Sequence, residues 1–417
     1  MITSEQLRKI CSSYKKQAWI GGLSQANMQL IDISSCTNFR TGANLHHKFD
    51  CVWIYENTLE AFGDLSWKIV LDEAIRLLKS NGLLVIRFHE NRNFSLPMLK
   101  AYIGRRYGIS VSIEFESTDV VVFRIQRLRM KVYEDTLWTF AILTQGKERK
   151  SNVIKFLSAI RKNDEDYQHQ IIVCGPKDKD YDEFKVDYVD TKIFDESKFA
   201  EISKKKNLIA RLANNENILI CHDRYYIADD FFRSFEKFGY DFDFVTLPQE
   251  TESGIRYPYY CALYQPTFSW THPIDVKDLN VIFDTQYVNG GLMIFKRSTL
   301  LSLQFNELLH WCQMEDVEIS KRYLDYSIPP RVNFLTKAFV IEVPGIRSED
   351  FKRFDSYSNG QFTKFVDEAI RSEFIGSMRT GWTSSESKKK TKKKVLVKFS
   401  FKKKFPFISI KRRKDVK

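Results

Sequence analysis

The sequence contains few cysteines, and their spacing suggests no pairing. There are seven, odd in number and scattered, without a CxxC pair. This pattern argues against a disulfide scaffold and a structural zinc site, and it indicates reduced thiols in a cytoplasmic protein. The chain also lacks a run of about 18 apolar residues, so no transmembrane helix is predicted. Its start lacks the apolar core of a secretory signal, since it reads MITSEQLRKICSSYKK.

The body of the chain has little net charge. The whole sequence carries +12, but residues 388–417 hold fifteen Lys or Arg against one acid. This tail therefore has a net charge of +14, which leaves −2 for the remaining residues. A nucleic-acid-binding protein is expected to carry a basic face on a folded domain, so no nucleic-acid partner is predicted.

Residues 1–130 show the alternation of strands and helices that is typical of an α/β domain. Short apolar runs predict strands, and a longer amphipathic segment predicts a helix, ended by a glycine that favours the left-handed conformation of a helix stop. The predicted elements are a strand at 49–54, a helix at 64–79 stopped by Asn81-Gly82, a strand at 83–88, and a hairpin formed by 111–115 and 119–125.

This order resembles the second half of a class I SAM-dependent methyltransferase, which has a Rossmann-like fold. The Gly-rich first loop of that family is missing, because Gly21 and Gly22 do not follow a convincing strand. Asp32 stands where such enzymes place an acidic residue. We therefore predict a degenerate, catalytically silent copy that serves docking or assembly, with SAM not expected as a cofactor. An active methyltransferase and a generic α/β domain remain alternatives.

The stretch 207–230 joins a helix pattern to a strand that ends in polar residues. Apolar residues with helical spacing precede 218–221, an apolar run of the length of a buried strand. The strand ends in His222, Asp223 and Arg224. Ligands of open α/β sheets bind beyond the carboxyl ends of the strands, so this triplet is a candidate binding site. The plainer alternative is a strand-end Asp that caps the next turn.

A strand–loop–helix–strand unit precedes this stretch. Residues 136–144 and 170–174 predict strands, and the second strand stops at Gly175. Any unit of this kind places loops beyond its strands, so the pattern alone is weak evidence for a binding site.

Two further motifs follow the central stretch. Gly290 and Gly291 permit close approach of the backbone to a ligand, although a bulge or a turn would explain them equally well. Glu315 and Asp316 stand at a predicted helix start. The helix dipole alone favours acidic residues there, so this pair is ambiguous by itself.

Over roughly residues 136–323, the arrangement resembles the family-2-type GT-A glycosyltransferases. Their pattern is a helix with a basic or Asn residue, a hydrophobic strand, a DxD metal motif and, later, an acidic pair before a helix. The DxD position here reads His222-Asp223-Arg224, with a single carboxylate. The resemblance implies nucleotide-sugar contacts by Thr144, Gln145, Gly175, Lys206, Asn207, Asp223, Arg224, Gly290 and Gly291.

The resemblance also implies a metal ion and a catalytic base. A divalent metal, Mn²⁺ or Mg²⁺, is predicted at His222 and Asp223, since Mn²⁺ accepts imidazole and carboxylate ligands. Arg224 is the alternative source of positive charge. The family match makes Asp316 the catalytic base and Glu315 its catalytic neighbour, and a positioned carboxylate can take the proton of an acceptor hydroxyl.

The C-terminal residues predict a helical extension and a basic tail. Residues 346–387 contain several Phe residues that we expect to pack against the preceding domain, and 388–417 interleave basic and apolar residues. Each Lys or Arg near an anionic bilayer contributes about 1 kcal/mol. We therefore predict attachment of the tail to an anionic membrane, peripheral on the inner face of the cytoplasmic membrane. A nucleic-acid-binding tail and a disordered solubilising tail remain alternatives.

Taken together, the sequence predicts an α/β protein made of four consecutive segments. The expected parts are a Rossmann-like methyltransferase-type domain (1–130), a GT-A glycosyltransferase domain (131–345), a helical extension (346–387) and a membrane-associating tail (388–417). The expected function is inverting transfer of a sugar from a nucleotide-sugar donor to a glycan or lipid-linked acceptor in bacterial surface polysaccharide synthesis, such as O-antigen or capsule. The alternative is a non-catalytic, membrane-tethered assembly protein.

Overall fold

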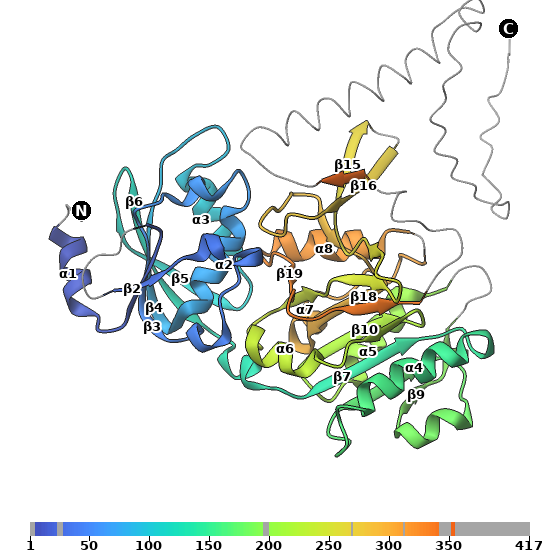
Figure 1. The fold of residues 1–417 in the computed structure, drawn as a ribbon. Helices are drawn as coiled ribbons and strands as arrows, with labels where there is room; N and C mark the ends of the chain where they lie inside the picture. The colour runs from blue at the N-terminus through green and yellow to red at the C-terminus, as the bar shows by residue number, and fades with distance from the viewer. Residues whose placement is uncertain are drawn as a thin grey trace, which may run out of the picture. The chain divides into compact units, whose positions relative to one another are not determined.

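The computed structural model divides the chain into two compact units, Met1–Ala369 and Ile370–Lys417. It describes residues 5–22, 28–194, 200–267, 270–311, 313–341 and 352–354, all in the first unit (Figure 1). Within the predicted helical extension, only Lys352–Phe354 are described, and they form strand β21. The predicted tail lies outside the described residues. The four-part domain division stays a prediction.

A six-stranded sheet is built from the first 130 residues, in the order β2-β1-β3-β4-β6-β5. The first four strands in this order run parallel, and β6 is antiparallel to both of its neighbours. The hairpin of β5 and β6 confirms the predicted one. The elements are α1 (Glu5–Ser13), β1 (Gln17–Ile20), β2 (Gln29–Ile31), β3 (Phe49–Ile54), α2 (Trp67–Leu77), β4 (Leu78–Arg87), α3 (Leu96–Arg105), β5 (Ile109–Glu116) and β6 (Val120–Arg127).

Two local predictions for this region are wrong. A strand does precede Gly21 and Gly22, because β1 pairs with both β2 and β3 and all four of its residues are buried. Four residues are too few to show a periodic signal. Helix α2 ends at Leu77 and β4 begins directly, so Gly82 lies within a strand rather than at a helix stop. A Cβ at Gly82 would stand 2.7 Å from Leu78 Cδ2, and close packing therefore explains this glycine.

A seven-stranded mixed sheet forms the centre of the following residues, in the order β19-β12-β18-β10-β7-β8-β9. Strands β10, β7, β8 and β9 run parallel, whereas β18 is antiparallel to β10 and β12. The elements are β7 (Trp138–Leu143), α4 (Lys150–Arg161), β8 (Gln170–Cys174), β9 (Asp187–Val189), α5 (Ile202–Leu212), β10 (Asn217–His222), α6 (Phe231–Phe238), β12 (Phe244–Thr246), β18 (Leu292–Lys296), α7 (Arg297–Ser302), α8 (Glu315–Asp325) and β19 (Arg331–Val332).

Two smaller sheets of four strands accompany the large one. Their orders are β11-β20-β13-β14 and β17-β15-β16-β21. Their strands are β11 (Tyr225–Ile227), β13 (Gln249–Thr251), β14 (Arg256–Tyr257), β15 (Tyr260–Thr267), β16 (Trp270–Val276), β17 (Gln286–Val288), β20 (Ala338–Val340) and β21 (Lys352–Phe354).

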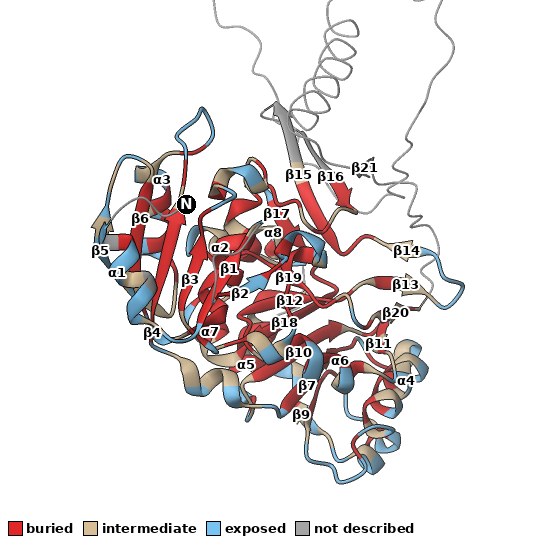
Figure 2. Ribbon diagram, turned by 60° about the vertical axis from the view of Figure 1, so that its left-hand side comes forward, coloured by how far each residue is buried: buried red, intermediate tan, exposed pale blue. Residues whose placement is uncertain are grey.

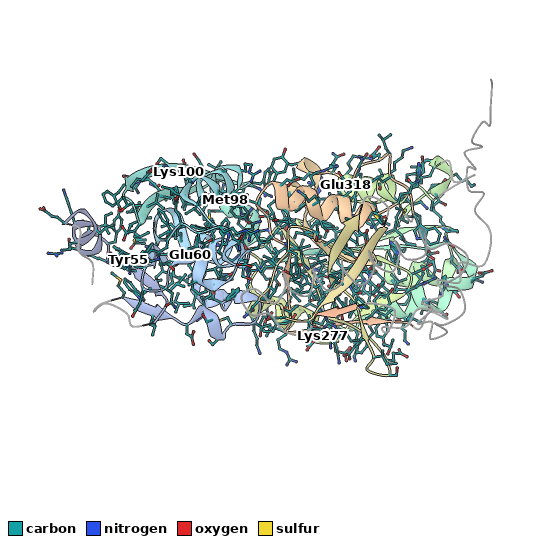
Figure 3. All side chains as sticks on the ribbon, turned by 90° about the horizontal axis from the view of Figure 1, so that it is seen from above. Tyr55, Glu60, Met98, Lys100, Lys277 and Glu318 are labelled. Atoms are coloured by element: carbon teal, nitrogen blue, oxygen red, sulfur yellow. The ribbon has the colours of Figure 1, made fainter. Side chains whose placement is uncertain are left out.

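The large sheet is buried on both faces. Every residue of β7 is buried, and the buried strands stand out in Figure 2. Trp138 and Phe140 pack on one side with residues of α4 and α6, and Ala141 packs on the other with residues of α5 and α8. Figure 3 shows the side chains between the helices and the sheets. Glu318, which is labelled there, belongs to α8. Burial on both faces explains why these strands read as continuous apolar runs.

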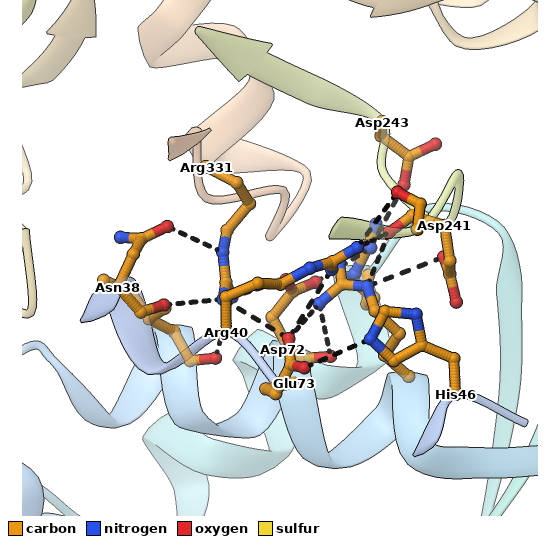
Figure 4. Close-up of polar contacts among 12 residues, drawn as sticks. Asn38, Arg40, His46, Asp72, Glu73, Asp241, Asp243 and Arg331 are labelled. Carbon is orange, nitrogen blue, oxygen red and sulfur yellow. Dashed lines mark hydrogen bonds and ion pairs between the residues drawn. The ribbon is translucent and has the colours of Figure 1, made fainter. Parts of the chain in front are cut away.

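Buried charged side chains connect the six-stranded sheet region to the seven-stranded one (Figure 4). Arg331 of β19 donates to Asp72 Oδ2 at 3.0 Å and to Glu73 Oε2 at 3.3 Å, both on α2. Arg331 also donates to the carbonyl of Asn38 at 2.7 Å. Buried ions require partners of this kind, because the interior does not solvate them.

The same network reaches the loop before β12. Arg76 Nε donates to the carbonyl of Asp241 at 2.6 Å. Arg106 Nη2 lies between two carboxylates, 3.0 Å from Asp72 Oδ1 and 3.1 Å from Asp243 Oδ2. The arginines of the first 130 residues and the aspartates before β12 therefore form buried ion pairs with one another.

Candidate functional site

The predicted donor-side residues gather at the carboxyl end of the parallel strands β7 and β10. Asp223 follows β10, and its Oδ2 accepts a hydrogen bond from Thr144 Oγ1 at 2.9 Å and from the backbone N–H of Gln145 at 3.3 Å. Asn152 Nδ2 donates to the Asp223 carbonyl at 2.9 Å. The sequence prediction missed Asn152, whose only signal is a polar residue in the first turn of the helix after the loop. These bonds fix the strand-end carboxylate against the β7–α4 loop.

Gly175 is explained by packing against this loop. The N–H of Thr144 donates to the Cys174 carbonyl at 3.0 Å. A Cβ at Gly175 would stand 2.4 Å from Thr144 Cγ2, so no larger residue fits. The predicted contact of Gly175 with a nucleotide stays a prediction.

His222 lies in a different environment from its neighbour Asp223. Its Nε2 is shielded from solvent without a hydrogen-bond partner. Burial, followed by the positive charges of Lys206 and Arg224, lowers the pKa of His222 to about 3, so the ring is neutral at physiological pH. The imidazole therefore faces two cations, whereas the Asp223 carboxylate faces Thr144.

Within the described chain, His222 and Asp223 have few further ligands beside them for a divalent cation. Among the residues that the structure describes, no group of three His, Cys, Asp or Glu side chains is placed to hold a metal ion. Asp223 Oδ2 already accepts two hydrogen bonds, and the positive charges of Lys206 and Arg224 disfavour a further cation at His222. The predicted Mn²⁺ or Mg²⁺ remains a prediction, and the chemistry proposed below uses the residues of the chain alone.

The turn between β17 and β18 links this strand end to the predicted base. The N–H of His222 donates to the Gly291 carbonyl at 2.9 Å. Asn289 Oδ1, which the sequence analysis missed, accepts from the Gly291 N–H at 2.8 Å. The N–H of Gly290 donates to Asp316 Oδ2 at 2.9 Å. A Cβ on Gly290 would stand 2.9 Å from Asp316 Cβ, so the approach of Asp316 requires glycine here.

Asp316, the predicted base, is a carboxyl held by backbone N–H groups and with a raised pKa. It lies in the first turn of α8, where its Oδ1 also accepts from the Val317 N–H at 2.9 Å. Desolvation, followed by the negative charge of Glu315, raises the pKa of this half-buried carboxyl to about 6. General bases work best when their pKa lies near the working pH. The structure thus places an ionised, basic carboxylate at this position above pH 6.

Lys206 and Asn207, both predicted to contact the donor, are bonded within the chain. Lys206 Nζ donates to the Gly290 carbonyl at 3.1 Å and to Glu315 Oε1 at 3.4 Å. The Asn207 side chain donates to the Phe305 carbonyl and accepts from the Phe305 N–H, both at 2.9 Å. Their predicted contact with a nucleotide sugar stays a prediction, and here both residues hold neighbouring segments together.

Backbone hydrogen bonds and chain neighbours connect Asp316 to Asp223. Asp316 contacts Gly290, the adjacent Gly291 contacts His222, and His222 precedes Asp223. The structure therefore places the candidate base and the strand-end carboxylate at the same end of the large sheet.

Comparisons with known proteins give a distant structural likeness. No protein-family model matches the chain, and no curated protein matches it. It is similar to the crystal structure of S. aureus TarS 1–349 in complex with UDP-GlcNAc, with 14% identity, 57% of this chain and 66% of that chain covered, and a TM-score of 0.35. The complex of the same fragment with UDP gives 14% identity, 57% and 65% coverage, and a TM-score of 0.30. A further TarS structure gives 14% identity, 57% and 40% coverage, and a TM-score of 0.31.

Among the residues that the structure describes, no helix combines the length and apolar character that crossing a bilayer would require.

Proposed function

We propose that this chain is a glycosyltransferase that moves a sugar from a nucleotide-sugar donor to a hydroxyl of a glycan or lipid-linked acceptor, with inversion. The observation that carries the proposal is Asp316, a carboxyl with a pKa near 6, held by two backbone N–H groups. Its connection through Gly290 and Gly291 to the strand end at Asp223 supports a site that serves donor and acceptor together.

The proposed step is a single displacement. The acceptor oxygen forms a bond to the anomeric carbon while the bond from that carbon to the diphosphate oxygen breaks. The leaving nucleoside diphosphate takes the bonding electron pair, and Asp316 takes the acceptor proton. Arg224, at the end of β10, supplies positive charge toward the leaving diphosphate, and Asp223 orients the donor through the β7–α4 loop.

A panel of nucleotide sugars tests this function. Each donor is incubated with the protein, with and without Mn²⁺ or Mg²⁺, and release of the nucleoside diphosphate is measured. We expect turnover with at least one donor, and its kcat/KM to fall on the acid side of about pH 6 as Asp316 is protonated. No release from any donor would favour the alternative, a non-catalytic assembly protein of a polysaccharide-synthesis complex.

Two substitutions assign the residues. Asp316→Asn and Asp223→Ala are each expected to abolish turnover. Loss of the general base at Asp316 alone costs about 10²–10⁴-fold, and Asp223→Ala removes the carboxylate proposed to orient the donor. Asp229→Asn is the matched control, because Asp229 is exposed and pairs with Lys162 away from the site. Near-normal activity in either site variant would show that its residue has been wrongly assigned.

The remaining parts of the proposal concern location. We propose that residues 388–417, net +14, bind an anionic membrane at the inner face of the cytoplasmic membrane, where a lipid-linked acceptor of bacterial surface polysaccharide is found. Removing these residues should release the protein from anionic liposomes in a flotation assay. Binding that persists without them would assign the anchor elsewhere.

A further inference from the structure

Lys206 is a buried lysine between three segments of the candidate site. Its side chain is 1% exposed and extends from α5 to the Gly290 carbonyl and to Glu315 at the start of α8. The ammonium also lies over the Phe305 ring, 4.9 Å from the ring centroid. Lysine is almost never fully buried unless it is paired, so these contacts are the reason that this one is stable here.

The two members of the acidic pair consequently have different surroundings. Glu315 is buried with 7% of its side chain exposed, and its carboxylate faces Lys206. Asp316 is half-buried and receives the Gly290 N–H. Lys206 thus contacts the carbonyl of the same glycine whose N–H orients Asp316. The Gly290 peptide therefore lies between the two carboxylates, with Glu315 reached through Lys206 and Asp316 bonded directly.

We propose that Lys206 and Glu315 form a positioning pair that holds the Gly290 turn against α8 and aims Asp316 at the acceptor. The inference rests on the proposed function, in which Asp316 takes the acceptor proton. Glu315, predicted from the sequence as a catalytic neighbour, acts through Lys206 and does not take the proton. Lys206, predicted as a donor contact, serves the acceptor side of the site.

The charges around Asp316 give this pair a measurable signature. The groups that face Asp316 are Glu315 of α8, Lys206 of α5, Tyr287 of β17 and Cys261 of β15. Burial raises the pKa of Tyr287 and of Cys261, so both are neutral at physiological pH. Glu315 raises the pKa of Asp316 and Lys206 lowers it. Removing one or the other charge should therefore move the titration of Asp316 in opposite directions.

The experiment compares four full-length variants, Lys206→Met, Lys206→Arg, Glu315→Gln and the Met/Gln double variant. The pH dependence of kcat/KM is measured from pH 4.5 to 9. We expect Glu315→Gln to move the acid limb down by about one pH unit and Lys206→Met to move it up, since a charge adjacent to a carboxyl changes its pKa by about 1–3 units. Without Lys206, the two carboxylates share one site, and the apparent value belongs to the pair. The double variant should lie between the single variants, and Lys206→Arg should restore most of the activity.

A second readout separates this inference from the proposed function. Carboxyl carbon NMR on selectively labelled protein follows the titration of Asp316 directly in each variant, whether or not transfer is observed. Shifts of opposite sign support the pair. Shifts of the same sign, or equal losses of activity with unmoved titrations, would overturn it. If wild type transfers no sugar but the NMR shifts have opposite signs, the proposed function fails while the charge pair stands.

Discussion

Arg331 and Asp72, 259 positions apart in the sequence, form a buried ion pair at 3.0 Å. The pair joins the last strand of the large sheet to a helix of the first 130 residues. Around it, carboxylates and guanidinium groups from both regions are interleaved, and neither region alone holds the balancing charges. The first region is therefore part of the structure that supports the candidate site.

Replacing Arg331 by Met should destabilise the protein strongly. The change removes one of the buried cations shared by Asp72 and Glu73, and the donor to the Asn38 carbonyl is lost as well. Both carboxylates keep Arg76, so the loss is expected to approach but not exceed the about 3–5 kcal/mol of a fully broken buried pair. Urea unfolding followed by circular dichroism measures the change. Arg211→Met is the control, because Arg211 is exposed and its Nη1 makes only a loose surface ion pair, 3.8 Å from Glu307 Oε1. Equal stability of the two variants would show that the network contributes little.

Gly290→Ala should reduce activity without unfolding the protein. The new methyl group would stand 2.9 Å from Asp316 Cβ and push the carboxylate away from the Gly290 N–H. Misplacement of a reacting group by about 1 Å can cost 10²-fold in rate. Steady-state kinetics gives the loss, and a thermal melt checks the fold. Gly104→Ala in α3 is the matched control, since nothing lies within 4 Å of its added Cβ. Unchanged kcat in Gly290→Ala would contradict the assigned geometry.

Thr144→Val tests the donor side. Valine keeps the shape of threonine but removes the hydroxyl that donates to Asp223 Oδ2. A hydrogen bond to a charged group contributes about 1.5–3 kcal/mol, so we expect kcat/KM for the donor to fall about tenfold or more. Thr139→Val, near the start of β7, removes a bond to Gln170 and should leave kcat/KM for the donor unchanged. A kcat/KM for the donor that responds equally to both changes would indicate a general effect on the strand.

SAM should not stabilise this protein. Strand β1 does lead into Gly21 and Gly22, so one reason for predicting a silent domain, the missing strand, does not hold. Helices and strands alone do not make a cofactor site, and we retain the prediction of a silent domain. A thermal melt with and without SAM decides, because a ligand that binds only the native state raises its melting temperature. A clear rise would overturn the prediction.

The strands and helices near the site followed from the sequence because their apolar runs are long and bounded by polar residues. The run 170–174 is β8 as expected, and Glu315 begins α8 as expected. The sequence did not predict the contacts between residues that are far apart in the chain. Arg331, for example, is one arginine among many, and its pairing with Asp72 depends on how two sheets are brought together.

The roles of the site residues show the same limit. Motif order predicted Asp316 as the base, and its two backbone bonds agree with that role without testing it. Motif order also predicted that Asn207 contacts the donor. In the structure, the Asn207 side-chain amide is hydrogen-bonded to the backbone N–H and carbonyl of Phe305. Side-chain direction depends on packing across elements, which the spacing of residues along one chain does not contain.

Lys296 should make stability depend on pH in the alkaline range. It is fully buried at the end of β18, where its ammonium donates to Asn217 Oδ1 at 2.7 Å and to the Val132 carbonyl at 3.0 Å. Burial lowers the pKa of Lys296 to about 8, below its ordinary value of 10.5. Below pH 8, the folded and unfolded states both hold the proton, so this group adds no pH dependence. Between pH 8 and 10.5, the unfolded state binds more protons, and stability rises with pH by at most about 1.4 kcal/mol per unit.

The test compares wild type with Lys296→Met by urea unfolding at several pH values from 7 to 10. The lost hydrogen bonds add an offset that does not change with pH, so the informative quantity is how the difference between the two proteins varies. We expect wild type to gain stability relative to the variant as pH rises above 8. Lys237→Met, which removes an exposed lysine of α6, controls for the loss of a charge. A difference that stays constant, or that falls, would show that the Lys296 amine keeps its proton throughout this range, stabilised by the bonds to Asn217 and Val132.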